Sequence, residues 1–329
     1  MKKKLTVSIA AYQVEKYIRK TLSSFIEDGI RDQVEVLIID DGGHDGTLRI
    51  AKEYAARYPD TFFPIHKENG GWGSTVNCGI ENAHGDDFKL LDGDDYFASR
   101  ELRKLLECLS REPADLIYTP YRSFDDKSGK TNYIRWCDGP DPDENKAISL
   151  NNFDGYLPLA MHSICVKKKL LSENKVSLIE HCFYSDVEYS IKVFYYAENI
   201  LFLNATVYNY REGLSSQSVS LNGERKHYRE HLKVLYRSMD FLKQHQPTGN
   251  KKKLLQGRLK EMVENQYQMM LHLTPTKEHK IEFIEYDSEL KKKYSEYYDI
   301  RRKTVRYLRM FHFIPYGMAA RYSIKKVEQ

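Results

Sequence analysis

Three aspartates crowd into the stretch LLDGDDYF (90–97). Asp92, Asp94 and Asp95 stand at the end of an apolar run typical of a buried strand, and Gly93 permits a turn between them. Carboxylates this close repel one another, and a bound divalent cation is a usual compensation because hard oxygen ligands suit Mg²⁺ or Mn²⁺. The alternative is a solvated turn that caps the next helix, which would use one aspartate but not three. The pattern therefore favours a site for a metal and a diphosphate.

A second acidic cluster lies in IIDDGGHDGT (38–47), again directly after an apolar run. Asp45 is well placed to cap the helix that follows, so a turn and a cap explain it completely. That interpretation leaves Asp40 and Asp41 unexplained. A carboxylate at this position could accept hydrogen bonds from a nucleobase imide or from a ribose hydroxyl.

A glycine-rich loop, NGGWGST (69–75), lies between a predicted strand and a predicted helix. Exposed backbone amides and a helix dipole at such a position favour a phosphate. The loop matches the dinucleotide fingerprint only in part, because Val76 occupies the place of the third glycine. Lys67 and Trp72 are close to the loop in the sequence, and Trp72 could either stack on a sugar or fold back onto the core.

The elements that would position these residues alternate between strand and helix over the first 120 residues. The predicted strands cover residues 5–12, 34–40, 62–66, 88–92 and 115–119, and helical patterns fill the intervals between them. This alternation predicts an α/β fold with a doubly wound, mostly parallel sheet, whose ligand sites lie at the carboxyl ends of the strands. After about residue 222 the pattern becomes helical, which predicts a C-terminal helical appendage.

The composition excludes several classes of protein. The chain has 329 residues, 41% of them hydrophobic and 30% charged, and a mean hydropathy of −0.63, which is typical of a soluble globular protein. No apolar segment approaches the ~18 residues of a membrane span, so an integral membrane protein is excluded. Five cysteines without a CxxC pair fit a reducing compartment. Gln13, Glu15 and Lys16 interrupt the first apolar run, so a cytoplasmic protein without a secretory leader is expected.

The basic charge is concentrated at the C-terminus. Residues 291–329 hold 11 basic and 3 acidic residues, which leaves 40 basic against 44 acidic residues before them. Within 291–326 the basic residues are interleaved with Tyr, Phe, Leu and Met. Such a segment can lie on an anionic membrane surface, here the inner membrane face, or its apolar face can pack on the rest of the protein. Nucleic-acid binding is not expected, because acidic clusters occupy the predicted strand ends.

The order of these motifs resembles the nucleotide-binding half of an inverting family 2 glycosyltransferase with the GT-A fold. The segments that carry the resemblance are SIAAY (8–12), IIDDGGHDGT (38–47), NGGWGSTVNCGIENAHGDDF (69–88) and KLLDGDDYF (89–97). The resemblance implies that Asp41 contacts the base, that Tyr12 stacks near it and that Asp92 faces the ribose. It also implies that Asp94 or Asp95 holds the metal, Mn²⁺ or Mg²⁺. The remaining residues expected at the nucleotide-sugar site are Ala10, Lys67, Gly71 and Gly93.

The downstream half carries the same resemblance. HCFYSDVEYSIKVFYYAENILFL (181–203) resembles the family segment in which an acidic pair opens a helix and its aspartate is the catalytic base. Ser185 replaces the usual glutamate here, and Asp186 holds the base position. Without the resemblance, the helix dipole alone explains an aspartate at a helix start. VYNYREGLSSQSVS (207–220) resembles the family's tyrosine-rich strand, arginine and serine-rich loop near the diphosphate, which nominates Arg211.

The acceptor side and the donor identity are less defined. Trp72 and His162 are assigned to the acceptor, and His162 or His181 could bind sugar hydroxyls or serve as a third metal ligand, although a lone histidine is more often structural. Ala10, Ala11 and Gln13 depart from the residues common in the family. These departures leave the donor base and sugar open.

The resemblance implies metal-assisted transfer of a hexose or N-acetylhexosamine from a nucleoside-diphosphate sugar to a glycan or lipid-linked acceptor, with inversion, as in polysaccharide biosynthesis. The implied domains are a catalytic domain at 1–222, with a nucleotide-binding half at 1–120 and an acceptor half at 121–222, and a helical region at 223–329. A sugar nucleotidyltransferase would typically offer a glycine- and basic-rich N-terminal loop, which SIAAYQVEK lacks. A nucleic-acid- or partner-binding protein acting through the basic tail is the other alternative.

Overall fold

The chain forms two compact units, each with its own buried apolar core. The first unit comprises residues 1–214 and 248–251, and the second comprises residues 215–247 and 252–329. The computed structural model describes residues 2–111, 114–135, 146–213 and 220–327.

The first unit is built on an eight-stranded mixed sheet with the order β3-β2-β1-β4-β10-β6-β11-β9. Its strands are β1 (Leu5–Ala11), β2 (Val34–Asp40), β3 (Phe62–His66), β4 (Asp87–Asp92), β6 (Leu116–Tyr118), β9 (Ile148–Ser149), β10 (Ile164–Lys167) and β11 (Asn199–Phe202). The four strands from β3 to β4 are parallel, whereas β10 runs antiparallel to both β4 and β6. Ala10 pairs with both Ile39 and Asp92, so β1, β2 and β4 end at the same edge of the sheet. The predicted α/β fold with a mostly parallel sheet is confirmed.

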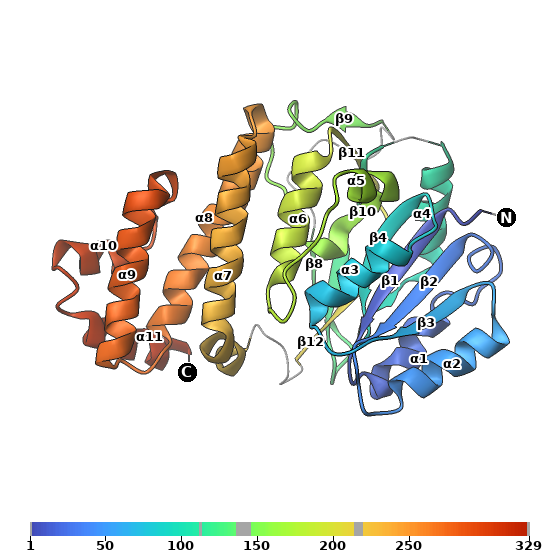
Figure 1. The fold of residues 1–329 in the computed structure, drawn as a ribbon, viewed down its shortest axis with the longest axis horizontal. Helices are drawn as coiled ribbons and strands as arrows, with labels where there is room; N and C mark the ends of the chain where they lie inside the picture. Colours follow the sequence, from blue (N-terminus) through green and yellow to red (C-terminus); the bar gives the residue numbers. More distant parts are fainter. Residues whose placement is uncertain (1, 112–113, 136–145, 214–219, 328–329) are drawn as a thin grey trace. The chain divides into compact units, whose positions relative to one another are not determined.

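Helices flank this sheet (Figure 1). They are α1 (Glu15–Ser23), α2 (Thr47–Arg57), α3 (Trp72–Asn82), α4 (Ser99–Arg111), α5 (Lys168–Glu173) and α6 (Ser185–Tyr196). In α4 the buried residues Leu102, Leu105 and Leu106 recur at helical spacing and form its core-facing stripe. α1 packs against α2, while α3 packs against β1, β2, α5 and α6. The first turns of α3 and α6 lie side by side, because a Cβ atom on Gly73 would lie 3.3 Å from Ser185 Oγ.

A smaller four-stranded sheet, with the order β5-β12-β7-β8, lies beside the acidic end of β4. Its strands are β5 (Tyr96–Phe97), β7 (Tyr121–Asp125), β8 (Thr131–Arg135) and β12 (Tyr208–Glu212). Tyr208 pairs with Phe97, which follows the three aspartates by two residues. This pairing brings β12, from the far end of the first unit, directly to the aspartates.

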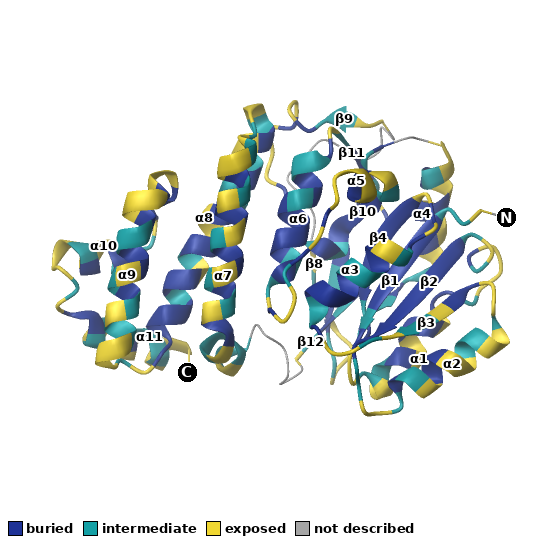
Figure 2. Ribbon diagram, viewed as in Figure 1, coloured by how far each residue is buried: buried dark blue, intermediate teal, exposed yellow. Residues whose placement is uncertain are grey.

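The core of the first unit follows the strands (Figure 2). All seven residues of β2 are buried, as expected for a strand covered on both faces. Its buried Glu35 accepts hydrogen bonds from Thr6 Oγ1 at 2.5 Å and from the backbone N–H of His84 at 2.9 Å, so the carboxylate is satisfied inside the protein.

The second unit is helical. Its helices are α7 (Leu221–His245), α8 (Gly249–Leu271, whose first residues belong to the first unit), α9 (Lys277–Lys293), α10 (Lys303–Met310) and α11 (Tyr316–Val327). Ser220 and Thr276 cap α7 and α9 by accepting hydrogen bonds from the backbone N–H groups of Gly223 and His279. In the described ranges, no helix is both long and apolar enough to cross a bilayer.

Candidate active site

Asp92, Asp94 and Asp95, here called the acidic triplet, occupy the end of β4 and the turn after it. The turn passes close to β1, because the backbone N–H of Gly93 donates to the carbonyl of Ala10 at 2.9 Å. A Cβ atom on Gly93 would lie 2.8 Å from Val14 Cγ2 and 3.0 Å from the Ala10 carbonyl oxygen. Glycine is therefore required at this position for a steric reason.

Asp92 is held at both its backbone and its side chain. Its Oδ1 accepts a hydrogen bond from Trp72 Nε1 at 2.7 Å, and its backbone N–H donates to Tyr208 Oη at 3.1 Å. Burial, together with the negative charges of Asp94 and Asp186, raises the pKa of Asp92 to about 7. The indole of Trp72 thus contacts the acidic triplet, whereas the sequence suggested either a sugar or the core as its partner.

Asp95 is almost fully buried, and both of its carboxylate oxygens accept hydrogen bonds. Tyr208 Oη donates to Oδ2 and the backbone N–H of Arg211 donates to Oδ1, each at 2.7 Å. Burial and the charges of Asp94 and Asp92 still hold the pKa of Asp95 well above its usual range. Asp95 therefore ties β12 to the triplet.

Asp94 is less enclosed than Asp95 and is half-buried. Its backbone carbonyl accepts a hydrogen bond from Arg211 Nε at 2.7 Å. Burial raises the pKa of the Asp94 carboxyl, and the guanidinium of Arg211 offsets part of that effect. Of the three carboxylates, Asp94 is the one that protein hydrogen bonds occupy least, which leaves it available to a ligand.

His162 lies in a 3₁₀ turn (Met161–Ser163) that precedes β10, where the sequence predicted a strand over 161–166. Its ring packs against Tyr121, Tyr208 and Tyr210, with 4.7 Å between ring centroids in each case. Burial and the charge of Lys89 lower the pKa of the His162 imidazole to about 3, so the ring is neutral. Within the described residues its Nδ1 is buried and has no hydrogen-bond partner.

The carboxylates of the acidic triplet and the imidazole of His162 together fit a divalent cation. One ligand atom each from Asp92, Asp95 and His162 lies within 4.8 Å of the others, and Asp94 is the neighbour of Asp95 in the chain. A neutral imidazole with an unpaired ring nitrogen is a common metal ligand, and carboxylates suit Mg²⁺ or Mn²⁺. A cation would also relieve the repulsion that raises the pKa of the carboxyls.

Lys89 is a residue of the site that the sequence analysis missed. It lies on β4, three residues before Asp92, and its side chain is fully buried. Its Nζ donates to the backbone carbonyls of His162 at 2.8 Å and Ile164 at 3.0 Å, so it holds the turn that carries His162. The FKLLD pattern gave one signal, a lysine inside an apolar strand, that could have pointed to it.

Lys89→Met is expected to flatten the dependence of stability on alkaline pH. Burial lowers the pKa of Lys89 to about 8, below its ordinary value of 10.5 in the unfolded chain. The unfolded state therefore binds more protons between these values, and the stability of the wild type rises as pH increases from about 8 to about 10.5. Urea unfolding of both proteins across this range measures the effect; parallel profiles would contradict it.

Asp186 lies in the first turn of α6 and interacts with the acidic triplet. Its negative charge is one of the causes that raise the pKa of Asp92. α6 packs against α3, whose first residue, Trp72, contacts Asp92. The predicted base and the predicted metal site are therefore brought together from distant parts of the sequence.

Asp41 organises the glycine-rich loop. Its buried carboxylate accepts hydrogen bonds from Lys67 Nζ at 2.9 Å, Asn69 Nδ2 at 3.1 Å and the backbone N–H groups of Gly70 and Gly71 at 3.0 and 2.8 Å. Gly71 has φ of +80°, a conformation that favours glycine. The protein itself therefore supplies four donors to Asp41.

Three other residues from the predicted motifs lie just after β1, at the end of β2 or between β2 and α2. Asp40 hydrogen-bonds His66 Nδ1 through Oδ2 at 2.6 Å, and its buried Oδ1 has no partner in the described part of the chain. Asp45 accepts from the backbone N–H groups of Thr47 and Glu15, each at 3.0 Å, consistent with a capping role. Tyr12, just after β1, is 48% exposed.

Arg211 is nearly buried on β12 and is engaged by the protein. Besides its bonds to Asp95 and Asp94, its guanidinium pairs with Asp126 and lies 4.6 Å from the ring centroid of Tyr17. The serine-rich loop predicted after it, at 214–219, lies outside the described residues. Arg211 thus fixes the backbone of the triplet.

Binding of Mn²⁺ is expected to weaken as pH falls below about 7. Because the pKa of Asp92 is about 7 and its carboxylate lies beside the candidate ligand atoms of Asp95 and His162, protonation below that pH removes a negative charge next to the cation, and affinity falls by up to about tenfold per pH unit. The stability of the metal-free protein should instead fall as pH rises from about 4 to about 7. In this range the folded state keeps a proton on Asp92 that the unfolded chain has lost. Mn²⁺ titrations monitored by electron paramagnetic resonance at several pH values, with Asp92→Asn as control, test this. A pH-independent affinity would contradict it.

Comparison with known proteins agrees with this arrangement. The family model for glycosyl transferase family 2 matches residues 6–164. A putative glycosyltransferase of Bacillus subtilis, EpsH, is 28% identical over 219 residues, a match that covers 64% of this chain and 62% of that relative. The chain therefore spans less than two thirds of this relative's length.

Solved structures show the same fold. Staphylococcus aureus TarS in complex with UDP-GlcNAc has a TM-score of 0.58 at 18% identity, covering 97% of this chain and 90% of that one. The mannosyltransferase PcManGT from Pyrobaculum calidifontis, in complex with GDP-Man and Mn²⁺, has a TM-score of 0.55 at 13% identity, covering 98% and 87%. With the sheet order, these structures show that the chain has the GT-A fold, and within it residues 6–164 match the model for glycosyl transferase family 2.

Proposed function

We propose that this protein is an inverting glycosyltransferase that transfers a sugar from a nucleoside-diphosphate donor to a hydroxyl group of a glycan or lipid-linked acceptor. The observation that carries the proposal is the packing of the first turn of α6, which bears Asp186, against the first turn of α3, whose Trp72 hydrogen-bonds Asp92 at 2.7 Å. It indicates that a candidate base lies beside a candidate site for the metal and the nucleotide, as transfer by direct displacement requires. TarS with UDP-GlcNAc and PcManGT with GDP-Man support a nucleotide-sugar donor.

The donor would lie along the shared edge of β1, β2 and β4. We assign Asp41, Tyr12 and Ala10 to the base side, Asp92 and Gly93 to the ribose, and the glycine-rich loop with Lys67 and Gly71 to the sugar and phosphates. Asp41 also holds the glycine-rich loop in place, and Arg211, which we assign to the diphosphate, also holds the acidic triplet in place. Pre-positioned groups of this kind lower the ordering cost of binding.

We assign the cation to Asp94 and Asp95, with His162 as a further ligand. When bound, a divalent ion would stabilise the negative charge of the departing diphosphate. Asp95 and Tyr208 keep the turn in place, and Lys89 keeps the His162 turn in place. Metal binding also depends on the neutral state of the imidazole, which its burial maintains.

Asp186 would accept the proton of the acceptor hydroxyl as that oxygen attacks the anomeric carbon from the side opposite the diphosphate. This geometry inverts the anomeric centre, and Trp72 and His162 would line the acceptor side. General-base catalysis by a positioned carboxylate contributes roughly a hundred- to ten-thousand-fold.

We further propose that residues 1–222 form the catalytic domain and that 223–329 form a helical region whose segment 291–326 contacts an anionic membrane. A donor panel tests the central proposal: the protein is incubated with several nucleotide sugars with and without Mn²⁺, and release of nucleoside diphosphate and thermal stabilisation are measured. We expect metal-dependent stabilisation by a nucleoside diphosphate. Stabilisation by a nucleoside triphosphate, with release of pyrophosphate from a sugar phosphate, would favour a nucleotidyltransferase instead.

A further inference from the structure

The C-terminal helices α10 and α11 carry a concentration of exposed apolar side chains. In the described part of the chain, 13 large hydrophobic residues are exposed, and seven of them lie between residues 307 and 327. These seven residues, here called the tail face, are Tyr307, Met310, Phe311, Ile314, Met318, Tyr322 and Val327. They are not scattered singly, because the ring centroids of Tyr307 and Phe311 lie 4.6 Å apart and Tyr307, Met318 and Tyr322 line one pocket, and contiguous exposed apolar side chains mark an interaction site.

The tail face is not needed to attach these helices to the second unit, because a different face does so. Val305, Leu308, Tyr316 and Ala320 are buried at 1% exposure or less. The ring of Tyr316 lies 5.3 Å from that of Phe283 on α9. The apolar pattern of the tail therefore divides into one face that packs in the core and a second that remains at the surface.

The turn between the helices directs side chains to these two faces. His312 and Phe313 both have positive φ, at 50° and 59°, and the backbone N–H of Phe313 donates to the carbonyl of Leu308 at 2.7 Å. Phe313 packs against Phe283, at 6.0 Å between ring centroids, whereas Phe311 and Ile314 are 45% and 78% exposed. The turn thus presents two large apolar side chains to solvent.

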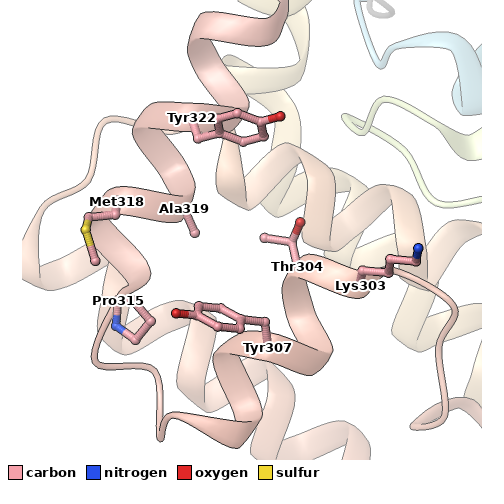
Figure 3. A pocket seen from close by; sticks show the side chains of 7 residues that line it. All are labelled: Lys303, Thr304, Tyr307, Pro315, Met318, Ala319 and Tyr322. Carbon is pink, nitrogen blue, oxygen red and sulfur yellow. The ribbon is translucent and has the colours of Figure 1, made fainter.

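A pocket of about 420 Å³ opens between α10 and α11 (Figure 3). Its lining combines apolar and amphipathic side chains, among them Tyr307, Met318 and Tyr322 of the tail face, with Lys303 at its edge. Tyrosine is suited to a membrane interface because its ring is apolar and its hydroxyl is polar.

The positive charge around the tail face indicates which kind of partner can bind it. Residues 300–327 contain eight basic residues and no acidic residue. The exposed basic residues on or beside the two helices are Arg301, Lys303, Arg306, Arg321, Lys325 and Lys326. Two copies of this face would repel each other, so a dimer through it is disfavoured. An anionic lipid surface satisfies both the positive charge and the apolar side chains.

We propose that the tail face of α10 and α11 is a membrane-docking surface, with Phe311 and Ile314 entering the interfacial region of a bilayer that contains anionic lipids. This inference rests on the proposed membrane contact of 291–326 and places that contact on the two helices at 303–327. It does not depend on the transfer reaction, because all of its residues lie in the second unit.

Binding of the full chain to vesicles tests the proposal. We expect it to float with vesicles of phosphatidylcholine and phosphatidylglycerol but not with phosphatidylcholine alone, and to be released at high salt, which screens charges beyond a few ångströms. Phe311→Ser with Ile314→Ser should weaken binding by about tenfold or more. The matched control is Ile281→Ser on α9, which removes another exposed isoleucine and should bind as the wild type does.

Two further measurements separate the contribution of the basic residues from that of the apolar side chains. Arg306→Glu with Lys325→Glu should lose binding to the anionic vesicles, whereas Lys291→Glu with Lys292→Glu, an equal change of charge on α9, should retain most of it. In Ile314→Trp, a blue shift of fluorescence on adding anionic vesicles, beyond that of the wild type, would show insertion. Stabilisation by a nucleoside diphosphate and Mn²⁺ should be unchanged in all these variants, which separates docking from the transfer site.

Four outcomes would overturn the proposal. These are no binding to anionic vesicles, equal binding to both kinds of vesicle, equal losses in the tail-face variant and the Ile281 control, and a dimer in solution that Phe311→Ser with Ile314→Ser dissociates. The last result would assign the tail face to a second copy of the chain.

Discussion

Replacing Asp186 by asparagine is expected to lower the rate of sugar transfer by roughly a hundred- to ten-thousand-fold. Asparagine has nearly the same shape but cannot take the proton of the attacking hydroxyl. Binding of the donor nucleotide should survive, because the residues assigned to it lie on β1, β2, β4 and the glycine-rich loop. The measurements are single-turnover transfer from the donor identified by the panel and thermal stabilisation by nucleoside diphosphate and Mn²⁺.

The result also separates two roles for Asp186. If the residue served only the dipole at the start of α6, Asp186→Asn would lower stability by about 0.3–1 kcal/mol and leave the transfer rate unchanged. Glu188→Gln is the matched control, because Glu188 lies in the same first turn and accepts hydrogen bonds from the backbone N–H of Ile179 and from Lys192. We expect it to affect stability more than rate. Wild-type transfer by Asp186→Asn would remove the residue from the mechanism.

Replacing Asp94 by asparagine is expected to abolish the stabilisation that Mn²⁺ and a nucleoside diphosphate give together. A ligand present at a hundred times its dissociation constant stabilises a protein by about 2.7 kcal/mol, so the loss is measurable as a shift in melting temperature. Transfer should fall by about a hundredfold or more, because a metal contributes several kcal/mol and each 1.4 kcal/mol is tenfold in rate. The metal-free protein should keep its stability, because Asp94 is only half-buried.

Asp95→Asn should differ from Asp94→Asn by destabilising the metal-free protein. The two carboxylate oxygens of Asp95 accept hydrogen bonds from Tyr208 Oη and from the backbone N–H of Arg211, so the amide nitrogen of asparagine would face one of these donors. We expect the metal-free protein to lose about 1–3 kcal/mol of stability. If Asp94→Asn kept the Mn²⁺-dependent shift while His162→Phe lost it, the cation would be held by Asp92, Asp95 and His162 without Asp94.

The strands and the acidic motifs were open to prediction from the sequence because their causes are local. Seven buried residues in β2 produce an apolar run, and the carboxylate of Asp45 accepts a hydrogen bond from the backbone N–H of Thr47, the first residue of the next helix. The position of the acidic triplet follows in the same way, since strand ends in a parallel sheet share an edge. The strand expected at 161–166 was wrong in its first half, where Lys89 holds a 3₁₀ turn through backbone carbonyls.

The partners of the site residues depended on contacts between distant segments. Asp41 and Arg211 look like ligand-binding residues in the sequence, yet their donors and acceptors come largely from the protein. Trp72 could have faced a sugar or the core, and it hydrogen-bonds Asp92. The hydrophobic periodicity of the sequence does not reveal these partners, because each contact joins residues that are far apart in the sequence.

By itself, the sequence determined the order of strands and helices, the positions of the carboxylates at strand ends and the basic character of the tail, because these follow from neighbouring residues. Only the tertiary structure decided that the first turn of α6, which bears Asp186, packs against the turn of α3 that contacts Asp92, that His162 is neutral and buried, and that the tail has a second apolar face at the surface. Burial and charge proximity are properties of the packed chain. They arise when the pairing of β4 with β10 and of β5 with β12 brings remote residues into one site.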